Sequence, residues 1–84
     1  GKLVKVVYDP LFKKKFSKIK DKASKKKIIK QVKKLNDNPT LGKPMRYGRK
    51  GTRELYISPY RLSYQFIAEE NLLLFLDIYH KNFQ

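Results

Sequence analysis

Residues 51–64 read GTRELYISPYRLSY, and this stretch predicts a β-hairpin. Apolar and polar residues alternate on both sides of Ser58-Pro59, which is typical of two strands that each bury one face. If Ser58-Pro59 forms a two-residue turn, Tyr56 lies opposite Arg61. The same count places Leu62 on the buried face, so Tyr56 and Arg61 are predicted on the open face of the sheet.

Two charged neighbours leave alternatives open within this hairpin. Glu54 lies diagonally across from Arg61 and offers it an ordinary salt bridge in place of a ligand. Arg53 falls on the core-facing register, so either it lies at the rim of the sheet or the register is shifted by one residue. The sequence alone does not decide between these readings.

Upstream of the hairpin, the pattern predicts one strand and two helices. Residues 3–8 are rich in Val and predict a strand. Asp9-Pro10 is a typical helix start, Asp21 offers the same capping chemistry to a second helix, and Asn38-Pro39 stops it. The expected apolar stripes of the two helices are Leu11, Phe12, Phe16 and Ile19, then Ile28, Ile29, Val32 and Leu35.

Downstream, residues 71–79 predict a last strand that is apolar on both faces. The expected fold class is therefore α+β in the order βααβββ, with two antiparallel N-terminal helices packed on one face of a small antiparallel sheet. Eighty-four residues suffice for one domain, so residues 1–84 are predicted to be a single domain.

Composition excludes several classes of function. The chain has no Cys and one His, which argues against disulfides, a metal site or a cofactor held by thiolates. No apolar run approaches the ~20 residues of a membrane helix, and a cytoplasmic protein that does not bind membranes is expected. The formal net charge is +14, which favours a polyanionic partner.

The basic residues fall into two groups. Residues 10–34 contain twelve lysines and one acid, a pattern that suits nucleic acid, an acidic protein or simply a solvated face. The second group includes arginines, whose guanidinium groups bind phosphate directionally, and tyrosines that can stack on RNA bases lie between them. The candidate RNA-binding residues are Lys43, Arg46, Arg49, Lys50, Tyr56 and Phe83.

The hairpin, together with the ending LDIYHK at residues 76–81, resembles the RelE/ParE toxin superfamily. The resemblance extends over almost the whole chain. It implies a small α+β toxin of a type II toxin-antitoxin system, neutralised by a cognate antitoxin. In the RelE branch it implies cleavage of mRNA on the ribosome, whereas the ParE branch poisons DNA gyrase.

By this resemblance, four residues match the family's basic site positions: Arg61, Arg53, His80 and Lys81. They are the candidate catalytic residues, and we expect them to converge on one patch that grips a phosphodiester. Phe83 stands near the place of an aromatic residue that follows the basic position in several members. Leu55 replaces a Lys often found two positions after the strand basic residue.

When the 2′-hydroxyl group of RNA attacks the neighbouring phosphorus, the extra negative charge on the phosphate must be stabilised. One proton must leave the 2′-hydroxyl and another must reach the departing 5′-oxygen. The arginines and Lys81 suit the first task, His80 suits proton transfer, and Glu54 is the nearest acidic candidate for a base. The leading hypothesis is a ribosome-dependent mRNA endoribonuclease that inhibits translation, with no cofactor or metal and with ribosome, mRNA and antitoxin as partners. The alternatives are a ParE-like gyrase inhibitor and a non-catalytic RNA-binding relic.

Overall fold

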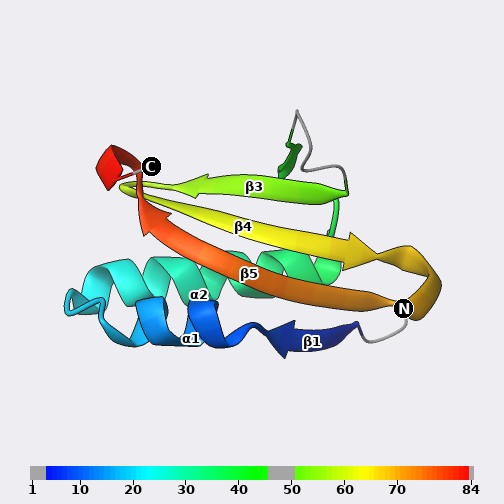
Figure 1. Ribbon diagram of the computed structural model, residues 1–84, viewed down its shortest axis with the longest axis horizontal. Coiled ribbons are helices and arrows are strands. Elements are labelled where there is room, and N and C mark those ends of the chain that lie inside the picture. Colours follow the sequence, from blue (N-terminus) through cyan, green and yellow to red (C-terminus); the bar gives the residue numbers. More distant parts are fainter. Residues whose placement is uncertain (1–3, 46–50, 84) are drawn as a thin grey trace.

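The computed structural model describes residues 4–45 and 51–83, apart from the Phe83 side chain (Figure 1). Two helices and five strands form the fold, and short 3₁₀ turns occupy Ala68–Glu70 and Lys81–Phe83. In chain order the elements are β1 Lys5–Tyr8, α1 Pro10–Ser17, α2 Lys22–Asp37, β2 Lys43–Pro44, β3 Thr52–Ile57, β4 Tyr60–Ile67 and β5 Leu72–His80.

Both helices begin at the predicted aspartates. The Asp9 carboxylate accepts a hydrogen bond of 2.8 Å from the Leu11 amide, and Pro10 occupies the first helical position, where it needs no donor. Asp21 accepts from the Ala23 amide at 3.2 Å and from the Ser24 hydroxyl at 2.7 Å. The capping residues therefore set where α1 and α2 start, and the two helices run antiparallel beside each other (Figure 1).

The sheet has the order β1-β5-β4-β3-β2. The predicted α+β class and the helix pair are confirmed, but two details of the predicted βααβββ antiparallel sheet are corrected. β1 pairs with β5 in parallel, so the sheet is mixed, and the two-residue β2 adds a fifth strand at the other edge. Alternation of apolar residues reports which face is buried but not the direction of the neighbouring strand, which is why the parallel pair was not predicted.

The hairpin register agrees with the prediction. Tyr56 pairs with Arg61, Leu55 with Leu62, and Arg53 with Tyr64. Arg53 therefore does lie on the core-facing side, and no shift of one residue occurs. Tyr56 and Arg61 share the opposite, open face of the sheet.

The core lies between the helices and one face of the sheet. Leu35 of α2 packs with Leu62 and Tyr64 of β4 and with Leu73 and Phe75 of β5, and all five side chains are fully buried. A core of this kind holds the strand ends in fixed positions, and the candidate site is built at those ends. Within the described ranges, neither helix is long and apolar enough to cross a membrane.

Candidate functional site

Two of the predicted basic residues meet over the ring of Tyr56 on the open face of the sheet. The Arg61 guanidinium carbon lies 5.6 Å from the ring centroid, and the Lys81 ammonium lies 5.8 Å from it. Both distances suit cation–π contact. Tyr56 is 49% exposed, Lys81 is also exposed and the Arg61 side chain is 35% exposed, so a ligand can reach the ring and both cations.

Glu54 completes this group of side chains. Its Oε1 atom accepts a hydrogen bond of 2.7 Å from the Arg61 guanidinium, and its Oε2 atom accepts one from the Tyr79 hydroxyl. The strand register brings the three residues together, since Tyr79 pairs directly with Arg61 and Glu54 lies diagonal to it. We call Glu54, Tyr56, Arg61, Tyr79 and Lys81 the open-face cluster.

The Arg61 guanidinium has donor capacity beyond its ion pair. Its NH1 nitrogen binds Glu54, whereas its buried Nε has no acceptor among the residues that the structure describes. A guanidinium carries five N–H donors, so one carboxylate oxygen satisfies only a part of them. Because Nε is buried, a phosphate that binds Arg61 has to share the outer part of the guanidinium with Glu54 or displace it.

The electrostatic surroundings of Tyr56 favour its ionised form. Hydrogen bonding with Ser58, followed by the positive charges of Lys81 and Arg61, lowers the pKa of the phenol below its ordinary value. Partial desolvation opposes this change without cancelling it. Tyr56 is thus a better proton donor than an ordinary tyrosine.

Arg53 does not belong to the open-face cluster. Its guanidinium donates to the Gly42 carbonyl at 2.7 Å and to the Thr40 carbonyl at 3.3 Å. These bonds hold the chain between α2 and β2 against the rim of the sheet. The expectation that Arg53 converges with Arg61 on one patch is wrong, because the confirmed hairpin register places the two on opposite faces.

His80 adjoins the cluster in sequence, but its ring packs on Tyr60 and not with Arg61, so the expected single patch is wrong for it as well. The imidazole packs edge to face on Tyr60, 5.6 Å between ring centroids, and Tyr60 packs against the core. Its Nδ1 accepts a hydrogen bond of 3.2 Å from the Asn82 amide. His80 lines a pocket of about 370 Å³ between the sheet and the end of α1. Successive residues of a strand point to opposite faces, which separates His80 from Tyr79.

The remaining predicted residues are Lys43, Arg46, Arg49, Lys50 and Phe83. Lys43 is exposed on β2, where its backbone pairs with Glu54. Arg46, Arg49 and Lys50 lie outside the described residues, as does the side chain of Phe83.

Tyr79 was not among the predicted site residues, although it is one of the tyrosines interleaved with the basic residues of the C-terminal half. Its pairing with Arg61 across β4 and β5 would have indicated this role. That pairing depends on the β4–β5 register, which is irregular between Ser63 and Tyr64. Asp77, by contrast, pairs with Lys15 at 2.9 Å and serves the packing of α1.

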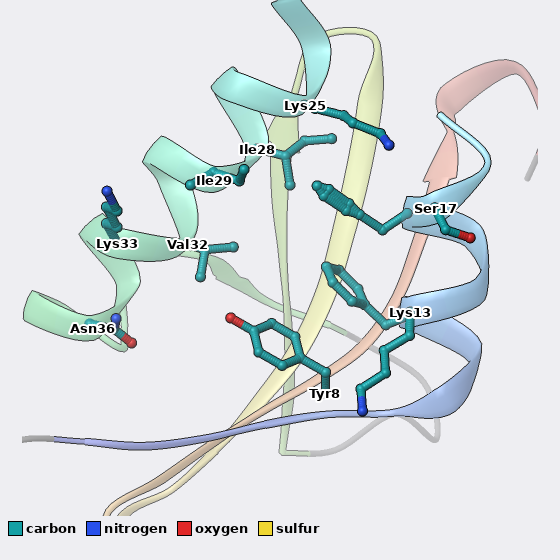
Figure 2. A pocket seen from close by; sticks show the side chains of 11 residues that line it. Tyr8, Lys13, Ser17, Lys25, Ile28, Ile29, Val32, Lys33 and Asn36 are labelled. Atoms are coloured by element: carbon teal, nitrogen blue, oxygen red, sulfur yellow. The ribbon is translucent and has the colours of Figure 1, made fainter. Parts of the chain in front are cut away.

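A second feature, the helix groove, lies on the other side of the molecule, between α1, α2 and β1. This groove of about 560 Å³ has apolar walls and a basic rim, as Figure 2 shows. The apolar lining residues are Tyr8, Phe12, Phe16, Ile28, Ile29 and Val32, and the lysines are Lys13, Lys25 and Lys33. Ile29, on the wall of this groove, is 47% exposed.

Metal binding finds no support in the described part of the chain. Among those residues, no three His, Asp or Glu side chains lie close enough together to hold an ion.

Comparison with known proteins identifies the family. The model of the ParE toxin of the type II toxin-antitoxin system parDE matches residues 6–84. None of the curated protein sequences is significantly similar to the chain.

Solved structures share the fold at low sequence identity. The isolated Escherichia coli RelE toxin superposes with a TM-score of 0.79 at 17% identity, over 92% of this chain and 83% of that one. The YoeB/ParE toxin from Agrobacterium tumefaciens gives 0.81 at 15% identity, over 92% and 98%. The archaeal RelE-RelB complex from Pyrococcus horikoshii gives 0.76 at 12% identity, over 99% and 100%. Since the family model spans nearly the whole sequence, this chain belongs to the ParE toxin family of type II toxin-antitoxin systems.

Proposed function

We propose that this toxin inhibits translation by cutting mRNA on the ribosome, and that the open-face cluster performs the cut. The observation that carries the proposal is the exposed Tyr56 ring with Arg61 and Lys81 against it and the Glu54 carboxylate beside Arg61. An aromatic ring can stack on an unpaired base while the cations hold the backbone phosphate. The cluster then places a candidate base, Glu54, and a candidate acid, Tyr56, beside that phosphate.

Glu54 takes the part of general base. A phosphate that binds Arg61 competes with Glu54 for the guanidinium, and the released carboxylate stays beside Tyr79, whose hydroxyl donates to it. From there it accepts the proton of the 2′-hydroxyl as that oxygen bonds to phosphorus. Arg61 and Lys81 stabilise the negative charge that develops on the phosphorus oxygens.

Tyr56 takes the part of general acid. As the bond between phosphorus and the 5′-oxygen breaks, the phenol gives its proton to that oxygen, and its lowered pKa makes this transfer easier. The products are a 2′,3′-cyclic phosphate and a 5′-hydroxyl, and solvent returns the proton from Glu54 to Tyr56. His80 has no part in this scheme. The ribosome supplies the alignment of the RNA, which alone can contribute ~7–11 kcal/mol.

The test is to incubate the toxin with programmed ribosomes and to map the 5′ ends of the mRNA. We expect cuts in the ribosomal A site for the wild type and none for Arg61→Ala. Lys30→Ala is the matched control, because Lys30 is an exposed lysine of α2 outside both pockets and should leave cutting unchanged. Absence of cuts with the wild type overturns the proposal. RNA binding without cuts identifies a non-catalytic relic.

The family description favours a second candidate, inhibition of DNA gyrase. The matching model is described as a ParE toxin, and the resemblance associates the ParE branch with gyrase. The engagement of Arg61 by Glu54 is compatible with this reading, since a gyrase inhibitor needs no accessible phosphate site. A DNA supercoiling assay separates the two candidates: the proposed endoribonuclease leaves supercoiling by gyrase unchanged at concentrations that stop translation.

The partner of the toxin, on this proposal, is an antitoxin. Solved neighbours from E. coli and P. horikoshii are complexes of a toxin with its RelB antitoxin. The helix groove offers this chain a place for such a partner, because its apolar walls suit one face of an amphipathic helix. The lysines of the groove's rim favour a partner helix that carries Asp or Glu residues beside its own apolar face.

A further inference from the structure

The pocket that contains His80 is a candidate site of its own. It lies between the C-terminal end of α1 and the ends of β4 and β5, at about 370 Å³. We call it the His80 pocket. Its lining residues are Lys15, Lys18, Ile19, Lys20, Tyr60, Ile78, Tyr79 and His80.

The charge of the His80 pocket is strongly positive. None of the described residues that line it is acidic. One of its three lysines, Lys15, forms an ion pair of 2.9 Å with Asp77, which lies next to the pocket. Lys18 and Lys20 are exposed and add two further charges at the mouth. The pocket therefore attracts an anion, and lysines bind phosphate as flexible point charges.

Packed aromatic side chains form part of the pocket wall. Tyr60 packs against the core and holds the His80 ring edge to face, 5.6 Å between centroids. Because the Nδ1 atom of His80 accepts a hydrogen bond from the Asn82 amide, the neutral ring carries its proton on Nε2. The pocket thus combines a packed imidazole and phenol with exposed lysines, a combination that suits a phosphate and the sugar attached to it.

The position of the pocket relates it to the open-face cluster. Tyr79 and His80 are neighbours on β5, and they pair across the strand with Arg61 and Tyr60 respectively. Tyr79 belongs to the cluster and also borders the pocket, so the two sites adjoin at the same end of the sheet. A single strand of RNA that passes around this end can contact both.

The geometry points to the His80 pocket as a second phosphate site, which holds a neighbouring phosphodiester of the same RNA strand while the cluster holds the one that is cut. This inference rests on the proposed function, because it assumes an RNA ligand. It assigns His80 and the lysines of the pocket to binding the RNA strand and not to the chemical step.

The first experiment measures binding of hexauridylate to the toxin alone at several salt concentrations. Each phosphate contact with single-stranded RNA contributes ~0.7 to the slope of log affinity against log salt. We expect the double variant Lys18→Ala/Lys20→Ala to lose at least about 0.7 of this slope. The matched control Lys26→Ala/Lys30→Ala removes the same charge from exposed positions of α2 outside the pocket. Equal losses of slope in the two variants would overturn the inference.

The second experiment uses the fact that the chain contains one His, so a single imidazole Cε1–H resonance reports on the pocket. Hexauridylate should shift this resonance in the wild type and in the α2 control but not in Lys18→Ala/Lys20→Ala. If hexauridylate does not shift the His80 resonance of the wild type, the second phosphate site is refuted, whatever the variants show. A shift with inorganic phosphate that hexauridylate does not reproduce indicates a general anion site and also overturns it. Both assays measure RNA binding in the absence of ribosomes. Their outcome is therefore independent of whether the toxin cuts mRNA.

Discussion

Gly42 lies so close to the Tyr64 ring that a Cβ atom at position 42 would be 2.8 Å from the Tyr64 hydroxyl oxygen. That hydroxyl accepts a hydrogen bond of 2.9 Å from the Gly42 amide and donates one of 2.8 Å to the Pro39 carbonyl. A fully buried core tyrosine thus holds the chain that leaves α2. Arg53 holds the same segment from the rim, through the Gly42 carbonyl.

The first prediction concerns the stability of this segment. Tyr64→Phe keeps the ring but leaves the buried Gly42 amide without its acceptor, so we expect a loss of ~1–3 kcal/mol in the free energy of unfolding. Gly42→Ala should cost a similar ~1–3 kcal/mol, because Tyr64 and the Glu54 carbonyl leave no room for a methyl group. Urea denaturation measures both. Wild-type stability of Gly42→Ala would show that the segment is free to move away.

The second prediction separates binding from cutting at Glu54. Glu54→Gln keeps the size of the side chain but removes the charge that competes with a phosphate for Arg61. We therefore expect tighter binding of hexauridylate, together with cutting on programmed ribosomes reduced by ~10²–10⁴, the usual effect of losing a general base. Fluorescence anisotropy measures the binding, and mapping of mRNA ends measures the cutting.

The control for this variant is Glu70→Gln, which removes the same charge from an exposed 3₁₀ turn at the other end of β4. It should leave cutting unchanged. If Glu54→Gln instead weakens binding and cutting in parallel, Glu54 positions Arg61 and is not the base.

The hairpin part of the site could be predicted because it depends on local pattern alone. The alternation of apolar and polar residues along both strands, together with the Ser58-Pro59 turn, determines which residues pair across the hairpin. The Glu54–Arg61 ion pair could therefore be predicted. The contacts of Tyr79 and the face of His80 could not be read in the same way. They depend on how β5 lies against β4, and an irregularity between Ser63 and Tyr64 changes that register.

The helix groove was missed for a related reason. The sequence predicted an apolar stripe on each helix, with Ile29 in the second, but not which residues of the stripe are covered. Ile29 is in fact about half exposed at the groove, because the position of α2 on the sheet decides how much of its apolar stripe is covered. Helical periodicity shows which side of a helix is apolar. It does not show how much of that side a neighbouring element will bury.

The third prediction tests the groove as the antitoxin site. Ile29→Asp places a carboxylate on the apolar wall, which should weaken binding of the cognate antitoxin at least about ten-fold, since burying an unpaired charge is costly. Calorimetric titration with purified antitoxin measures this. Since Ile29 is largely exposed, the fold should persist, and circular dichroism checks it. The control Lys30→Asp introduces the same residue one position along α2 and changes the charge by two units, against one for Ile29→Asp. An antitoxin affinity that falls as much in the control as in Ile29→Asp would point to charge alone.

The last prediction concerns the ionisation of Tyr56. Hydrogen bonding with Ser58 and the charges of Lys81 and Arg61 lower its pKa, so it should lose its proton at a lower pH than the ordinary tyrosine near ~10. Lys81→Met removes one of the charges that favour the phenolate and should therefore raise the pKa again. The ¹³Cζ resonance of Tyr56, assigned by comparison with Tyr56→Phe, measures both titrations directly.

The same shift has a consequence for catalysis. A general acid must be protonated, so cutting should decline as the pH rises through the lowered pKa of Tyr56. In Lys81→Met the overall rate is lower because a stabilising charge is lost, but its alkaline decline should move to higher pH. Tyr56→Phe keeps the ring for stacking and should bind hexauridylate normally while cutting falls ~10²–10⁴-fold and loses this decline. If Tyr56→Phe cuts as fast as the wild type, the ring serves only to bind RNA, and the proton for the leaving oxygen comes from another donor.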